Sequence, residues 1–272
     1  HYELNETGKY QVFFEETQGT ALFKQYIWAS GNSGFALTGV GRNPQEYPTV
    51  SIENGIDGSR AIKLETKSTG QFGETVKMPI AAGNLFLGSF DVNNAVQKPL
   101  KATRFGLPFG KKPLQLKGYY KYTPGTQPFK AKDKNGNTVT IPGQEDEGDI
   151  YAVLYEAAEL DGKALDGNNV LTSENIVALA RVEVEKKDEF TAFHVDFHYG
   201  SRIPIDWPKF IQDQRDPSDD GTAPYLSFSE EKMKNYEYNL AVVFTSSKYG
   251  AYFAGSVGST LCIDKVEIVC EK

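Results

Sequence analysis

Five side chains have the chemistry of a sugar-binding surface, and they fall in three separate parts of the sequence. A sugar ring presents apolar C–H faces beside hydroxyl groups, so its binding sites pair an aromatic ring with polar groups at the edge of that ring. Trp28 precedes a turn-rich stretch that contains Asn32, and such a stretch leaves amide groups accessible. Trp207 lies in a long polar segment, and Lys248 and Tyr249 follow a strand-like run. These residues predict a surface for a polyhydroxylated ring, although Trp28 has the alternative of a core position and Trp207 that of a loop anchor.

Hydrolysis of a glycosidic bond is a second chemistry to consider, and it needs two carboxylates. They stand about 5–5.5 Å apart for retention of configuration and about 6.5–9.5 Å apart for inversion. The chain has 36 acidic residues, so some pair will satisfy either distance. Asp149 and Glu156 bracket a strand-like run, but their spacing directs them to opposite faces of a sheet. Hydrolysis therefore stays an alternative without assigned catalytic residues.

Zinc and disulfide chemistry have weaker candidates. His194, Asp196 and His198 would share one face of a strand but spread over about 13 Å, too far for one zinc ion. Cys262 and Cys270 lie on one strand-like run and would be about 26 Å apart if the strand is straight. A disulfide needs a Cα separation of about 4.4–6.8 Å, so the two thiols are expected to be free.

The elements that must position these residues are short strands. Runs rich in aromatic and β-branched residues recur between Gly, Pro, Asn and Asp, a pattern typical of a sandwich or barrel. Asp149–Glu156 is almost continuously apolar, so we expect a central strand there. The best helix signal is Ser229 followed by two acidic residues, which suits an N-cap and a first turn. The other expected strands are Tyr10–Glu15, Ala61–Glu65, Leu114–Tyr122, Ile176–Val184, Glu189–Tyr199, Tyr238–Ser246 and Leu261–Val269.

Composition limits the fold class and the partners of the chain. A formal net charge of −7 repels phosphate backbones, so nucleic-acid binding is not expected. No apolar run approaches the roughly 20 residues that span a bilayer, and no signal peptide is recognised. The sequence shows no internal repeat and no linker. We therefore expect residues 1–272 to form a single all-β domain, an antiparallel jelly-roll β-sandwich with one or two short helices.

Several segments follow one another along nearly the whole chain and together carry a family resemblance. They are Phe14–Glu15, Trp28–Gly34, Ile80–Gly88, Phe105–Phe109, Leu116–Gly125, Ile150–Tyr155, Ser246–Gly255 and Ser259–Asp264. With these segments the chain resembles the putative carbohydrate metabolism domain family of exported lipoproteins in Bacteroides-type bacteria. The resemblance implies a jelly-roll fold, a place at the outer membrane, cell surface or periplasm, and a role in glycan use without an established reaction.

The same resemblance has implications for partners. Family members usually begin with a lipid-modified cysteine, which implies membrane anchoring through an element that this sequence does not contain. A polysaccharide or oligosaccharide is the implied ligand, and surface proteins of glycan uptake are implied partners.

A structural calcium ion is a further implication of the likeness to carbohydrate-binding jelly rolls. Many of them place a Phe-Glu pair near the first strand and an Ile-Asp pair in the last, and the two carboxylates bind Ca²⁺. The matching residues here are Glu15 and Asp264. Calcium takes six to eight oxygen ligands, so these two acids would supply only part of the site. The alternative is that both are ordinary acidic residues of their strands.

Three functions follow from these observations. The leading prediction is an exported carbohydrate-binding protein that recognises or helps to use a glycan. A glycoside hydrolase acting through two carboxylates is the first alternative, and a structural or adhesive cell-surface protein is the second.

Overall fold

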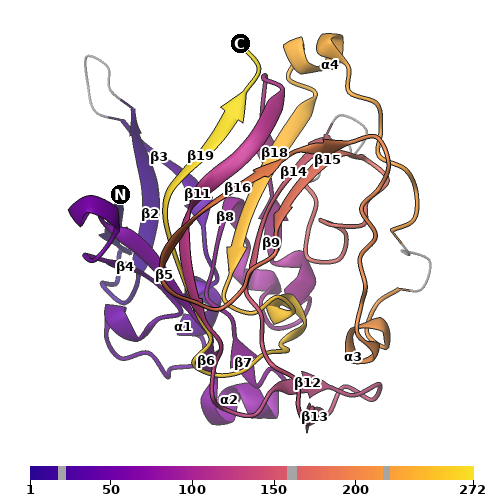
Figure 1. The fold of residues 1–272 in the computed structure, drawn as a ribbon. Coiled ribbons are helices and arrows are strands. Elements are labelled where there is room, and N and C mark those ends of the chain that lie inside the picture. The colour runs from indigo at the N-terminus through magenta and orange to yellow at the C-terminus, as the bar shows by residue number, and fades with distance from the viewer. Residues whose placement is uncertain (18–22, 158–163, 217–220) are drawn as a thin grey trace.

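Two antiparallel β-sheets pack face to face in the computed structural model, which describes residues 1–17, 23–157, 164–216 and 221–272 (Figure 1). In spatial order, the main path of the larger sheet is β1 (Tyr2–Leu4), β2 (Gln11–Thr17), β3 (Phe23–Ala29), β8 (Asn84–Phe90), β18 (Tyr238–Thr245), β14 (Asp149–Glu156), β15 (Ile176–Val182) and β17 (His198–Tyr199). Off this path, β9 (Thr103–Phe105) pairs with β8, and β10 (Leu107–Pro108) pairs with β18.

The smaller sheet contains β16 (Lys187–Asp196), β11 (Pro113–Thr123), β19 (Thr260–Cys270), β5 (Ala61–Glu65) and β4 (Thr49–Ile52), again in spatial order. Two short ribbons lie outside both sheets, β6 (Lys67–Ser68) with β7 (Ile80–Ala81) and β12 (Lys130–Lys132) with β13 (Thr138–Thr140). The chain crosses repeatedly from one sheet to the other, as in a jelly roll. This arrangement confirms the predicted all-β antiparallel sandwich.

Helices are few and short in the described residues. The α-helices are α1 (Asn32–Ala36), α2 (Gly70–Thr75), α3 (Lys209–Gln212) and α4 (Glu230–Lys234), where the sequence predicts one or two helices. The 3₁₀ turns are η1 (Pro44–Glu46), η2 (Ile56–Gly58), η3 (Val92–Asn94), η4 (Pro99–Lys101) and η6 (Gly250–Tyr252). The predicted cap of α4 is confirmed, because Ser229 Oγ accepts a hydrogen bond from the backbone N–H of Lys232. None of the described helices is long and apolar enough to cross a membrane.

The central strand β14 explains how the larger sheet is buried on both faces. All eight of its residues are buried, as its apolar run predicts. Ile150, Ala152 and Leu154 belong to the core between the two sheets. Tyr151 and Val153 point the other way, into a second core with residues such as Phe86 and Phe105. A strand that is covered on both sides loses the polar positions of a half-exposed strand.

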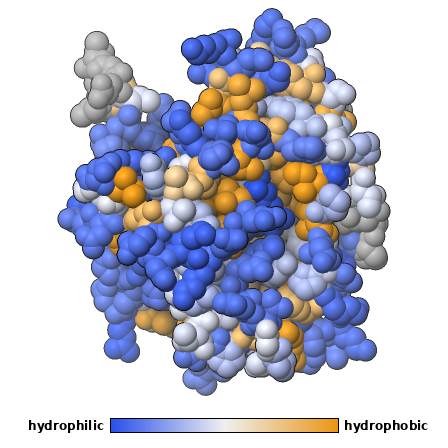
Figure 2. Space-filling model, in the orientation of Figure 1, coloured by the Kyte–Doolittle hydropathy of each residue, from blue (hydrophilic) through white to orange (hydrophobic). Residues whose placement is uncertain are grey.

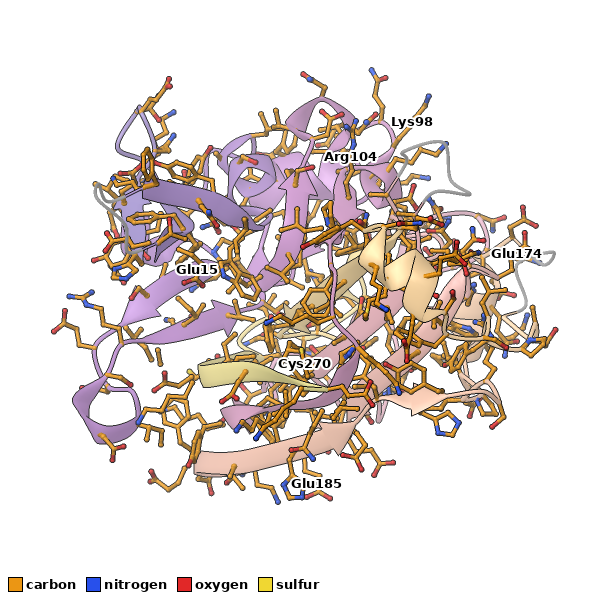
Figure 3. The ribbon with its side chains drawn as sticks, turned by 90° about the horizontal axis from the view of Figure 1, so that it is seen from above. Glu15, Lys98, Arg104, Glu174, Glu185 and Cys270 are labelled. Carbon is orange, nitrogen blue, oxygen red and sulfur yellow. The ribbon has the colours of Figure 1, made fainter. Side chains whose placement is uncertain are left out.

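Connecting segments cover the second face of the larger sheet. Figure 3 shows Lys98 and Arg104 on the opposite side of the molecule from Glu185, which precedes β16 of the smaller sheet. The segments after β8, β14 and β17 therefore form a third layer of irregular structure over the large sheet. On the face shown in Figure 2 the surface is largely hydrophilic, with hydrophobic residues visible in small areas.

One predicted strand is divided between the two sheets. The sequence predicts a continuous strand over Glu189–Tyr199, but β16 pairs with β11 and β17 pairs with β15. Phe197 lies between them and is buried in the inter-sheet core. The chain turns at this residue because its ring anchors the crossing from the smaller sheet to the larger one.

Candidate functional site

A cavity of about 200 Å³ lies on the loop-covered face of the larger sheet. Its floor is formed by side chains of four adjacent strands, Phe86 of β8, Val243 of β18, Tyr151 of β14 and Arg181 of β15. Its walls come from α1, α2, the segment around η4, residues 167–171, and the segment that includes η6. Ligand sites are commonly concave and mostly apolar with a few polar groups, and this cavity has that character.

An ion pair forms the polar end of the floor. Arg181 donates from Nε to Asp149 Oδ1 at 2.9 Å and from Nη2 to Asp149 Oδ2 at 2.7 Å. The side chain of Asp149 is only 4% exposed, so this bidentate geometry is what makes its burial tolerable. Burial opposes the charge of Arg181, but the adjacent carboxylate of Asp149 outweighs it and raises the pKa of the guanidinium.

A second cavity of about 270 Å³ has a different lining. Glu145, Glu147 and Asp206 contribute carboxylates, and Lys248 contributes the one cation of its lining. Lys248 also lines the first cavity, so the two spaces meet at this side chain. Its Nζ donates to Glu147 Oε2 at 2.8 Å. Burial works against the charged amine, but the hydrogen bond to Glu147 outweighs it and raises the pKa of Lys248.

Aromatic side chains gather where the two cavities meet. The ring centroids of Trp207 and Tyr249 are 6.4 Å apart, and Phe210 stands edge-on to Tyr249 at 5.7 Å. The guanidinium of Arg215 lies 4.2 Å from the centroid of Trp207, and its Nη1 donates to Tyr252 Oη at 2.9 Å. Trp207 is half-buried and packs against two apolar clusters, so it also anchors its loop.

Three of the five residues of the predicted sugar surface thus come together. Trp207 lines the first cavity, Tyr249 lines the second, and Lys248 lines both. The structure does not bring Trp28 or Asn32 to either lining.

Trp28 and Asn32 take part in the framework of the fold. Trp28 packs against the inter-sheet core, and its Nε1 donates to Glu15 Oε1 at 2.7 Å. Asn32 is buried, donates from Nδ2 to the carbonyl of Thr49 at 2.8 Å, and accepts from the backbone N–H of Thr49 at 3.1 Å. These bonds occupy the amide that an accessible turn would have offered to a ligand.

The two predicted calcium ligands are engaged by protein donors. Asp264 accepts from the backbone N–H of Ile56 at 2.7 Å and from Ser59 Oγ at 2.5 Å, while Glu15 accepts from Trp28. Within the described ranges no group of three or more His, Cys, Asp and Glu residues is placed to hold a metal ion. Calcium binding stays an untested prediction.

Sequence reasoning missed the polar floor of the first cavity. The sequence offers Asp149 only as half of a catalytic pair with Glu156. In the structure the two carboxylates have separate partners, because Asp149 accepts from Arg181 and Glu156 accepts from Lys232 Nζ at 2.6 Å. A charged residue at the start of an otherwise apolar, buried strand signals a buried partner, and that signal could have pointed to Arg181. Nothing local in the sequence marks Tyr151 as a residue of a cavity.

Comparison with known proteins gives one family and two close structural relatives. The family model of the putative carbohydrate metabolism domain matches residues 1–269. A protein of Bacteroides thetaiotaomicron VPI-5482, described as a putative glycoside hydrolase, is similar at 41% identity and a TM-score of 0.79, over 99% of this chain and 70% of that one. A second protein with this description, from Bacteroides vulgatus ATCC 8482, is similar at 34% identity and a TM-score of 0.77, over 100% of this chain and 96% of that one. No curated protein sequence matches the chain.

Proposed function

The chain belongs to the putative carbohydrate metabolism domain family, and from this premise we propose that it binds a glycan at the junction of the two cavities. The observation that carries the proposal is the meeting of Trp207, Lys248 and Tyr249 beside an acidic cavity. These residues come from two distant segments, yet they combine apolar ring faces with an amine and carboxylates. That combination matches the C–H faces and hydroxyl groups of a sugar ring.

The second cavity provides hydrogen-bonding groups for sugar hydroxyls. Glu145 and Glu147 are exposed residues, so their carboxylates are available to a ligand from solvent. Carboxylates accept hydrogen bonds from hydroxyl groups, and the Lys248 ammonium donates them. The half-buried ring of Tyr249 lines this cavity, with its centroid 6.4 Å from that of Trp207. A sugar bound here would stack on Tyr249 and direct its hydroxyls to the acidic side.

Binding to a polysaccharide and oligosaccharide panel, measured on an array and by calorimetry, tests this function. We expect Tyr249→Ala to weaken binding of the selected glycan about tenfold, the effect of about 1.4 kcal/mol. Tyr236→Ala is the matched control, because Tyr236 is 65% exposed and lines neither cavity. Absence of binding to every glycan in the panel, or equal losses in the two variants, would refute the proposal.

Glycoside hydrolysis is a second candidate, favoured by the three carboxylates around the second cavity. A hydrolase would use one as a general acid and another as a base or nucleophile. Release of reducing sugar from the panel, abolished by Glu147→Gln or Glu145→Gln, would support it. A folded protein that binds a glycan without turnover would leave recognition as the function.

The cellular setting is proposed from family membership. We propose export to the periplasm or the cell surface, anchoring through a lipid-modified cysteine, and cooperation with surface proteins of glycan uptake. Fractionation of cells that produce the full-length precursor, with and without detergent, tests the location and the anchor.

A further inference from the structure

The first cavity has a lining that suits a different ligand from a bare sugar. Its walls and floor are rich in phenylalanine and aliphatic side chains, among them Phe35, Phe86, Phe90, Phe105 and Val243. A sugar hydroxyl placed against such a wall would lose its hydrogen bonds to water without replacement, at a cost of about 1–3 kcal/mol each. An aromatic or aliphatic group would instead gain by leaving water.

One polar group in this apolar space has no partner. Tyr151 is only 5% exposed, and its hydroxyl makes no hydrogen bond to any residue that the structure describes. Every fully enclosed side-chain N or O atom of the described residues does have a partner, so the Tyr151 hydroxyl is not sealed in the core. Because Tyr151 lines the cavity, its hydroxyl opens into that space as an unused donor.

One cation, Arg181, lies beside this donor. Tyr151 and Arg181 are directly opposed in the β14–β15 pairing, and the guanidinium lies 6.0 Å from the tyrosine ring centroid. Lys248 lines the same cavity, and its Nζ donates to Glu147. The charged residues of the lining are Asp149, Arg181, Arg215 and Lys248. Arg181 is paired with Asp149 and Lys248 with Glu147, so a ligand that accepts from the Tyr151 hydroxyl displaces neither ion pair.

We propose that the first cavity binds a small aromatic monocarboxylate, with its ring among the phenylalanines and its carboxylate accepting from the Tyr151 hydroxyl near Arg181. The volume of about 200 Å³ fits this class, because an engineered cavity of about 150 Å³ holds a benzene molecule. A single ring with a short acidic arm therefore fills the space. The proposal does not depend on glycan binding at the junction.

Calorimetry with trans-cinnamate, its neutral analogue cinnamamide and the sugar acid glucuronate tests the chemical class. We expect cinnamate to bind about tenfold more tightly than cinnamamide, because a carboxylate accepts a stronger hydrogen bond than a neutral amide and is attracted by the nearby Arg181 guanidinium. Glucuronate should bind at least tenfold more weakly than cinnamate, because its ring hydroxyls would lie against apolar walls. Equal affinities for cinnamate and cinnamamide, or tighter binding of glucuronate, would overturn the proposal.

Two matched tyrosine variants test whether the ligand binds at the Tyr151 hydroxyl. Tyr151→Phe removes only a hydroxyl without a protein partner, so we expect unchanged folding stability and about tenfold weaker cinnamate binding. Tyr155→Phe is the control, because Tyr155 lies on the same face of β14 but its hydroxyl donates to the carbonyl of Phe105 and accepts from Asn239. It should lower stability and leave cinnamate affinity unchanged.

Thermal unfolding first shows whether both variants are folded. If they are, and Tyr151→Phe binds cinnamate as tightly as the wild type does, the assignment is wrong. This outcome is distinct from failure of the glycan proposal, since no glycan is present in the experiment. Conversely, a glycan array without binding would leave the cinnamate measurements intact.

Discussion

The two faces of the larger sheet are buried by different partners, and the difference separates stability from function. One face packs against the smaller sheet, and its side chains form a continuous apolar core. The other face is covered by connecting segments and retains a cavity, an ion pair and an unpartnered hydroxyl. A second sheet offers a regular surface that side chains can fill completely, whereas loops cover a face unevenly. The site lies where the covering is irregular.

Successive side chains of one strand contribute alternately to the inter-sheet core and to the cavity. In β14, Ile150, Ala152 and Leu154 serve the inter-sheet core, while Asp149 and Tyr151 serve the cavity. Since successive side chains point to opposite faces, a single strand supplies both without conflict. A substitution in such a strand therefore tests the role of one face, and a substitution at the next residue tests the role of the other face.

The largest expected effect comes from adjacent residues of β18. Phe244 is fully buried between the sheets, and Val243 is 4% exposed on the cavity floor. We expect Phe244→Ala to lower the free energy of unfolding by about 4 kcal/mol, because it leaves a void in a filled core. Val243→Ala should cost about 2 kcal/mol, since it removes two methyl groups next to existing empty space. Urea denaturation of both variants measures the two losses.

Cinnamate affinity provides a second comparison of the two faces of the larger sheet. Cinnamate affinity should change in Val243→Ala and stay unchanged in Phe244→Ala, provided that the latter is folded at the assay temperature. Equal stability losses in the two variants, or a change in cinnamate affinity at Phe244 alone, would show that the faces are not separate in this way.

An intermediate effect is expected at the ion pair of the cavity floor. Asp149→Asn keeps the shape of the side chain but leaves the mostly buried Arg181 without its counter-charge, and we expect a loss of about 3 kcal/mol. Adding Arg181→Gln should recover part of this loss, because the double variant has no uncompensated charge. Denaturation of the single and double variants measures the coupling. Strictly additive losses would mean that the pair contributes no mutual stabilisation.

The strands were the most predictable part of the fold. The run over Asp149–Glu156 predicts β14 to the residue, and alternation over Leu114–Tyr122 predicts β11 within a residue at each end. Local periodicity carries this information because burial imposes it residue by residue. The division of the predicted strand Glu189–Tyr199 at Phe197 was not predictable, because the choice between two sheets depends on the rest of the fold.

The site was predictable in its chemistry and less so in its geometry. Residue type marked Trp207 and Tyr249 as ligand candidates, and the structure brings their rings within 6.4 Å. The same reasoning selected Asn32, whose amide is consumed by the backbone of Thr49. A side chain's partners come from distant segments, so the sequence shows what a residue can bind and not what already occupies it.

The smallest expected effect concerns Asp146, a buried polar centre that has every partner it needs. Its Oδ2 accepts from Ser247 Oγ at 2.6 Å, from Ser256 N at 2.8 Å and from Ser259 Oγ at 2.7 Å. Ser247 follows β18 of the larger sheet and Ser259 precedes β19 of the smaller one, so this carboxylate joins the two sheets at one end. It lines neither cavity.

Protonation of this centre should stabilise the fold. Burial raises the pKa of Asp146 to about 6 from its ordinary value of 3.8, against the opposing effect of its hydrogen bonds. The folded state therefore holds the proton more tightly than the unfolded chain, and this contribution to stability is present at low pH and is lost as the pH rises through about 6. Acidification from about pH 7 to about pH 4.5 should add about 2 kcal/mol from this group.

Asp146→Asn isolates the contribution, because it removes the titrating proton at this position while other carboxylates titrate in both proteins. The difference in unfolding free energy between wild type and Asp146→Asn should shift in favour of wild type as the pH falls over that range. A difference that stays constant would mean that Asp146 is charged in the folded protein throughout. Because the group lies outside both cavities, cinnamate affinity should be the same in the two proteins at every pH, whereas Val243→Ala on the cavity floor changes affinity and stability together.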